Sequence, residues 1–187
     1  VTGSDFLDNS TRNRGGAIYS LGTLAVDGST FIDNLATASG SYGGAVGNYN
    51  GAPATITGST FHGNQAAYGG AVLGYQNTTV VVANSAFSGN YARTWGGGLF
   101  SHGASTFTVV NSTIAGNAAG TSGGGVYSHT NCQLTLRNSI VAINSAASMP
   151  DISGSFTTAS SHNQIGGQPR FLRDPNDGGD GWHDNPA

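Results

Sequence analysis

The chain has 187 residues, enough for one domain with its own core, and only 8% of them are charged. All basic residues are Arg and all acidic ones are Asp; the helix formers Lys and Glu are absent, which, together with 31 Gly, argues against helices. The net charge of −3 gives no basic footprint for nucleic acid, and no apolar run approaches the roughly 18 residues of a membrane-spanning helix.

One motif recurs along the chain: an apolar residue followed three positions later by Asn. The spacing from one motif to the next lies between 25 and 30 residues. The apolar positions are Phe6, Phe31, Phe61, Phe87, Ile114 and Val141. The asparagines are Asn9, Asn34, Asn64, Asn90, Asn117 and Asn144. Recurrence of residue type at a fixed period is typical of repeat architectures, in which each repeat is one supersecondary unit.

Each repeat contains three predicted strands. The first follows a Gly pair, such as Gly43-Gly44, and has one apolar residue at a shared position, as in Val46. The second alternates apolar and small residues with a period of two, as around Val80 and Val82. The third is very short and carries the motif itself. The repeats differ in length mainly after the Asn, so a loop is expected there.

Short strands that return at this interval without a helix can bury their apolar faces only by stacking, coil upon coil. The sequence therefore predicts an all-β fold, a single-stranded parallel β-solenoid of about six coils with equal positions about 4.8 Å apart. The Phe and Asn positions should form ladders, because stacked rings fill a core and stacked amides bond to one another. We expect the solenoid to cover residues 1–167 and an Asp/Gly-rich tail to cover residues 168–187.

The alternation of GGA[IV] with FxxN resembles the repeat of bacterial polymorphic outer-membrane proteins. More broadly, the chain resembles the secreted right-handed parallel β-helix proteins of the pectate-lyase-like superfamily. This resemblance implies a right-handed coil and an extracellular or cell-surface location. Enzymes of that superfamily place Asp, Arg, Lys or Ca²⁺ on an outer sheet of the coil, so the resemblance also says where catalytic residues would lie.

One pair of acids fits that description. Asp8 and Asp33 both lie two residues past the apolar residue of the motif, so we expect them one strand spacing apart. That separation is near the roughly 5 Å of a retaining glycosidase. The next three coils have Gly at this position, however, and no further acid joins the pair. The two are thus a weak catalytic candidate, and solvated turn residues are the preferred interpretation.

A stripe of aromatic and His residues is predicted outside the core. If Ile18 and its equivalents point inward, the residues one and three positions later point outward. The stripe consists of Tyr19, Tyr49, Tyr75, Phe100, His102, Tyr127 and His129. So much exposed aromatic surface is unusual for a monomer, and it predicts sugar stacking or self-association, with cover by other segments of the chain as the alternative.

The tail sequence DPNDGGDGWHDN places oxygen-bearing side chains in a Gly-rich setting, as calcium sites do. The candidate ligands are Asp174, Asn176, Asp177 and Asp180. Asx-rich turns form without a metal as well. Calcium is therefore a weak expectation, and no other cofactor is expected.

The function expected from these observations is structural. The chain would be a non-catalytic extracellular or cell-surface β-solenoid that serves as an adhesin, a stalk or a filament subunit. Open strand edges at the ends of a solenoid favour end-to-end self-association. The alternatives are a polysaccharide-active enzyme, either a lyase or a glycosidase, and a carbohydrate-binding module on the same fold.

Overall fold

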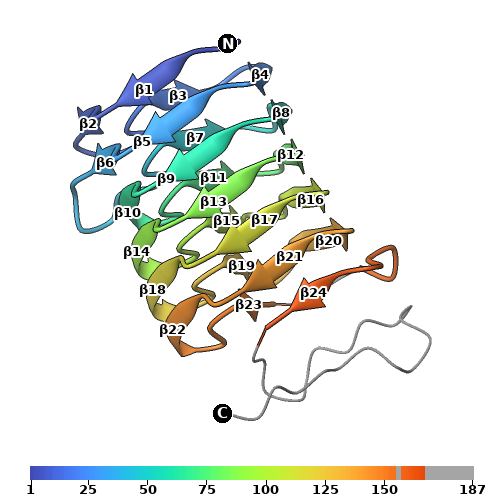
Figure 1. Cartoon of the computed structure of the whole chain (residues 1–187). Helices are drawn as coiled ribbons and strands as arrows, with labels where there is room; N and C mark the ends of the chain where they lie inside the picture. Colours follow the sequence, from blue (N-terminus) through green and yellow to red (C-terminus); the bar gives the residue numbers. More distant parts are fainter. Residues whose placement is uncertain (155–156, 167–187) are drawn as a thin grey trace.

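The computed structural model of the chain describes residues 1–154 and 157–166. They form a parallel β-solenoid of about six coils without a helix, which confirms the predicted fold class. Four strands per coil run in sequence around the axis, and each pairs in parallel with its counterpart in the next coil (Figure 1). The coils thus build four sheets, called sheets 1 to 4 in the order in which the chain visits them.

The strands of the four sheets are as follows. Sheet 1 contains β1 (Asp5–Leu7), β5 (Thr30–Ile32), β9 (Thr60–His62), β13 (Ala86–Ser88), β17 (Thr113–Ala115), β21 (Ile140–Ala142) and β24 (Gln164–Ile165). Sheet 2 contains β2 (Ser10–Thr11), β6 (Leu35–Ala36), β10 (Gln65–Tyr68), β14 (Tyr91–Trp95), β18 (Ala118–Ser122) and β22 (Ser145–Ser148). Sheet 3 contains β3 (Ile18–Ser20), β7 (Val46–Tyr49), β11 (Val72–Tyr75), β15 (Leu99–His102), β19 (Val126–Ser128) and β23 (Ile152–Ser153). Sheet 4 contains β4 (Leu24–Asp27), β8 (Ala54–Thr57), β12 (Thr79–Ala83), β16 (Thr106–Val110) and β20 (Gln133–Arg137).

Sheet 2 corrects the prediction of a loop after each Asn. Its strands are only two to five residues long, and the β10–β14 and β18–β22 pairings each contain a register shift. Such an irregularity breaks the alternation of side chains that identifies a strand in a sequence. The extra length in the second coil is a true loop over residues 37–41, and Arg93 donates from Nη2 to the Thr37 and Ala38 carbonyls of that loop.

The corners of the coil are residues in the left-handed conformation. At the corner between sheets 1 and 2 they are Asp8, Asp33, Gly63, Gly89, Gly116 and Ile143, with φ between 54° and 68°. Asp tolerates this region better than most residues, and Gly enters it freely. Ile143 is a β-branched residue there with a side chain that is 84% exposed, so its backbone conformation is strained without compensation from packing.

The Gly pairs at the corner between sheets 2 and 3 have two separate causes. Gly69 has a φ of +65°, which permits the sharp turn. Gly70 lies so close to the next coil that an added Cβ would collide with the carbonyl oxygen of Gly97. The first Gly therefore serves the turn, and the second serves the close stacking of neighbouring coils.

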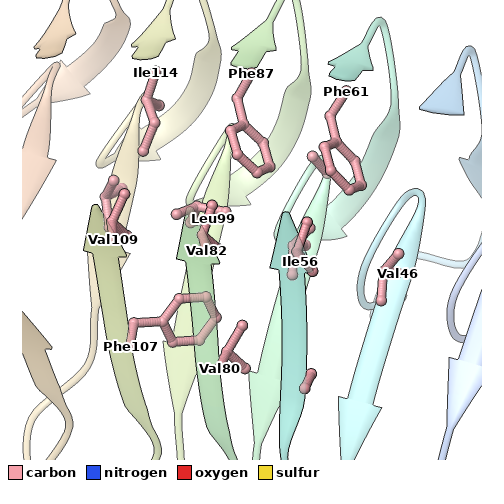
Figure 2. Close-up of a cluster of buried hydrophobic side chains, with 14 of the residues drawn as sticks. Val46, Ile56, Phe61, Val80, Val82, Phe87, Leu99, Phe107, Val109 and Ile114 are labelled. Atoms are coloured by element: carbon pink, nitrogen blue, oxygen red, sulfur yellow. The ribbon is translucent and has the colours of Figure 1, made fainter. Parts of the chain in front are cut away.

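The main core fills the space inside the coils. Phe6, Phe31, Phe61 and Phe87 stack with ring centroids 4.6–4.7 Å apart and planes within 4° of parallel. Ile114 and Val141 continue this ladder, and both are fully buried. Figure 2 shows the row of Phe61, Phe87 and Ile114 beside the inward residues of sheet 4.

Two polar ladders run along the same axis. In each coil the Asn backbone N–H and Nδ2 both donate to Oδ1 of the Asn in the following coil, for example from Asn64 to Asn90 at 3.0 and 2.9 Å. The Nδ2 also donates to the carbonyl of a ring residue one coil back, as from Asn90 to Phe61 at 3.0 Å. In the second ladder, the backbone N–H of Ser59 donates to Ser85 Oγ. Stacking therefore satisfies buried polar groups as well as apolar ones.

Each polar ladder ends on a residue of another type than the one that repeats along it: the Asn ladder ends on Asp151, and the Ser ladder ends on Asn163. Asn144 donates from its backbone N–H and from Nδ2 to Asp151 Oδ1, each at 2.9 Å. Ser139 donates from its backbone N–H to Asn163 Oδ1 at 3.0 Å. Asp151 is 2% exposed, so the Asn ladder ends on a buried carboxyl group that accepts both hydrogen bonds.

Candidate functional site

A second group of rings lies outside the main core, on the outer side of sheet 3. We call it the aromatic face, and it has three columns that run along the solenoid axis. The first column contains Tyr19, Leu73, Phe100 and Tyr127, with Gly47 between Tyr19 and Leu73. The second contains Tyr49, Tyr75, His102 and His129. The third lies at the corner where sheet 2 ends and contains Arg14, Tyr42, Tyr68 and Trp95.

The structure brings the predicted stripe together but corrects its predicted exposure. Tyr49 and Phe100 are only 2% and 1% exposed, and Tyr75, His102, Tyr127 and His129 are half-buried. Of the predicted stripe only Tyr19 is well exposed, at 43%. The third column is the reason, because Tyr42, Tyr68 and Trp95 pack against the buried cluster of Tyr49, Leu73 and Phe100. The chain thus covers much of this surface itself.

The sequence did contain a signal for the third column. Tyr42, Tyr68 and Trp95 each come directly before a Gly pair, and Arg14 has the same place in the first coil. A predicted loop before the Gly pair assigns its side chains to no face of the coil. Recognition of sheet 2 as a strand would have placed all four residues at the same corner.

Some neighbouring rings of the aromatic face are stacked, and others are tilted. Tyr42 lies 5.0 Å from Tyr68 with planes at 22°, and Tyr75 lies 5.1 Å from His102 with planes at 11°. Trp95 lies 5.3 Å from Tyr127 at 18°. Rings stacked in this way turn their faces toward one another and their edges toward solvent. The Tyr49–Tyr75, Tyr68–Trp95 and Phe100–Tyr127 pairs are instead tilted, with interplanar angles of 47–56°.

His102 and His129 are neighbours in the second column, with ring centroids 4.4 Å apart. Burial, and secondarily the proximity of His129, lower the pKa of His102, and its Nδ1 has no hydrogen-bond partner within the described chain. Residues 1–154 and 157–166 contain no group of three His, Cys or Asp side chains placed to hold a metal ion. The two rings meet at an interplanar angle of 53°, as a tilted pair within the aromatic face.

The aromatic face has a pocket at each end. At the N-terminal end of the solenoid, a pocket of about 490 Å³ is lined by Thr11, Asn13, Arg14, Tyr19, Gly40 and Tyr42. At the other end a pocket of about 320 Å³ is lined by Tyr127, Ser128, His129, Thr130, Asn131, Cys132, Ser153 and Gly154. The first pocket lies within the size range of small-ligand sites.

The first pocket is built around Arg14. Its Nη1 donates to the Tyr19 hydroxyl at 3.1 Å, and its Cζ lies 4.8 Å from the centre of the Tyr49 ring. The hydrogen bond to Tyr19 is also the main reason that the pKa of Arg14 is raised. Burial raises the pKa of Tyr49, so that phenol stays neutral beneath the guanidinium. Arg14 is thus a solvent-exposed positive charge in contact with the Tyr19 hydroxyl and the Tyr49 ring.

Asp8 and Asp33 are both exposed and lie at corners with φ of 54°. Their backbone N–H groups donate to Ile32 and His62 carbonyls in the following coil. Left-handed geometry accounts for Asp at these two positions and for Gly63 at the next. The candidate calcium ligands Asp174, Asn176, Asp177 and Asp180 lie outside the described residues.

The geometry of the coil agrees with the comparison to known families. The model of the right-handed beta helix region matches residues 1–167, which include all the coils, so the chain belongs to that family. Comparison with curated proteins and with solved structures gave no match. In the part of the chain that the structure describes, no helix is long and apolar enough to cross a membrane.

Proposed function

We propose that the protein is a non-catalytic structural β-solenoid of the extracellular space or cell surface, an adhesin or stalk. The observation that carries this proposal is the use of the repeated polar residues. Asn and Ser recur in every coil, and their side chains form hydrogen bonds between neighbouring coils. The features that define the repeat therefore serve length and rigidity, as a structural module requires.

End-to-end self-association belongs to this proposal. Among the described residues, three large apolar side chains of the first coil that do not line the first pocket are exposed: Val1, Leu7 and Leu21, at 48–54%. A second copy would cover them and would pair with the edge strands β1 to β4. We expect sedimentation to show concentration-dependent growth, and Thr2→Lys at this edge to suppress it. A monomer at all concentrations would contradict this part of the proposal.

Carbohydrate binding is the second candidate, and the half-buried aromatic face favours it. Tyr42, Tyr68, Tyr75, Trp95 and Tyr127 are all partly accessible on one side of the molecule. Aromatic rings with one accessible side are frequent at binding surfaces. The two pockets lie at the two ends of this face, and each includes rings of the face in its lining.

One experiment separates these candidates from an enzyme. The protein is incubated with a panel of neutral and acidic polysaccharides, and both retention of the protein and the release of new chain ends are measured. Neither signal is expected for the structural role, and retention alone is expected for the binding module. Chain cleavage that disappears in Asp8→Asn or Asp33→Asn, but not in the exposed control Asp5→Asn, would overturn the non-catalytic assignment.

A further inference from the structure

We propose that the Arg14 pocket binds a small organic anion in which a carboxylate is attached to a ring. The first step is the position of Arg14 in the fold. The corner column places Tyr42, Tyr68 and Trp95 in the following coils, and Arg14 takes the same corner in the first coil. Where the repeat places a ring, this coil places a charge, and a pocket lies beside it.

The second step is the orientation of the guanidinium. Gly47 lies directly below Tyr19 in the first column, and an added Cβ there would come within 3.1 Å of Tyr49 Cε2. The missing side chain leaves room for the Tyr49 ring beneath Arg14, and Tyr19 meets that ring edge-on at 5.2 Å. Although Arg14 is exposed, two rings and one hydrogen bond favour this orientation of the guanidinium.

The third step is the unused capacity of Arg14. A guanidinium has five N–H donors, and within the described chain the side chain of Arg14 forms a single hydrogen bond, to Tyr19. The groups that affect its charge are all tyrosines, so no carboxylate of the described residues neutralises it. A planar fork with free donors pairs best with a carboxylate, which accepts two parallel hydrogen bonds.

The rest of the pocket defines the body of the ligand. Tyr19 is 43% exposed and Tyr42 is half-buried, and both line the pocket together with the polar side chains of Thr11 and Asn13. Tyr42 begins the ring part of the third column, so one of its faces is not covered by a ring of a preceding coil. A ring carried by the carboxylate can pack against these tyrosines.

The test is a binding titration of the whole chain with four probes, followed by protein NMR or calorimetry. Glucuronate and benzoate supply the carboxylate on a sugar ring and on an aromatic ring, whereas acetate and glucose supply only one half of the proposed ligand. At least one of the first two should bind more tightly than both acetate and glucose. Preference for glucuronate would identify a sugar acid, and preference for benzoate an aromatic acid.

Variants then locate the site. Arg14→Gln should weaken binding by about tenfold or more, because a charge-assisted hydrogen-bonded pair is lost. Arg14→Lys should restore only part of the affinity, because an ammonium lacks the planar fork. The matched control is Arg12→Gln, an exposed Arg of the same coil that does not line the pocket. Unchanged melting temperatures establish that the variants are folded.

Three results would overturn the proposal: no binding of either ring-bearing carboxylate in the millimolar range typical of weak fragments, equal affinity for acetate, or equal loss of affinity in Arg12→Gln and Arg14→Gln. The inference does not rest on the structural role. Failure of the titration would leave that role intact, and cleavage of a polysaccharide would leave the Arg14 pocket intact.

Discussion

At the scale of single residues, Asp151 shows how an irregular position differs from the repeat. It accepts both hydrogen bonds that an Asn of the following coil would otherwise accept, and it is buried while it does so. Burial raises the pKa of its carboxyl group above its ordinary value of 3.8, and the two hydrogen bonds from Asn144 oppose this shift only in part. The charged form of Asp151 is therefore less stable in the folded protein than in the unfolded chain.

This shift predicts a pH dependence of stability. Because the folded-state pKa is raised, the contribution of Asp151 to folding is most favourable below pH 3.8 and declines as pH rises through the folded pKa. Asp151→Asn keeps an oxygen acceptor and removes the charge, so we expect a higher melting temperature than wild type at pH 7 and a smaller difference in acid. Thermal unfolding from pH 3 to 8 measures this. The exposed Asp5→Asn is the control, and a variant less stable than wild type at pH 7 would contradict the prediction.

The residues that could be predicted from the sequence are those that repeat. Phe61 and Asn64 recur with their type at the same phase, and stacking alone accounts for their burial. The burial of Tyr49 and Phe100 could not be predicted in this way, because their side chains lie outside the main core, on the outer side of sheet 3. Their cover comes from Tyr42, Tyr68 and Trp95. Tyr68 and Trp95 end β10 and β14 of sheet 2, which the sequence pattern did not identify, and Tyr42 forms an isolated bridge to Tyr68.

At the scale of elements, the ladders connect strands that are otherwise too short to be stable. Sheet 1 strands of the complete coils contain three residues each, and their apolar contact is mainly one ring or branched side chain per coil. The Asn that follows each strand adds hydrogen bonds in both directions along the axis. Asn90 accepts two bonds from Asn64 and donates to Phe61 and Asn117.

Removal of the side-chain amide of Asn90 should therefore remove hydrogen bonds that connect three neighbouring coils. Asn90→Ala leaves the buried donors of Asn64 and the carbonyl of Phe61 without partners, and unpaired buried groups cost about 1–3 kcal/mol each. We expect a loss of at least about 3 kcal/mol in the free energy of unfolding, measured in urea. Asn9→Ala at the exposed end of the ladder is the matched control and should cost far less. A loss in Asn90→Ala no larger than that in Asn9→Ala would contradict the prediction.

At the scale of the whole molecule, the number of coils and their parallel stacking were predictable, because the motif marks each coil once. The number of sheets was not, because sheet 2 lacks a regular alternation and contains small residues such as Ala66 and Ala92. The aromatic face depends on that missing sheet. The core residues of the solenoid were therefore predictable from the sequence, whereas the packing of the aromatic face was predictable only in part.

The interchangeability of coils leads to a prediction for the whole chain. Residues 118–144 begin after one ladder Asn and end on the next, and their core residues Val126, Leu134 and Leu136 are all buried. A second copy of this segment inserted after Asn144 should fold as an added coil, with Asp151 still at its end. Small-angle scattering should show the solenoid longer by about 4.8 Å, the strand spacing. An unfolded or unlengthened product would contradict this.

Asp151 and Asn163 have a consequence for how such a molecule changes its length. Because the ladders end on side chains that differ from the repeat, the end is specified locally and not by the number of coils before it. Duplication of a coil upstream leaves the end untouched, and deletion of a coil does so as well. The length of the solenoid should therefore change in steps of one strand spacing, about 4.8 Å, while Asp151 and Asn163 continue to end the two ladders.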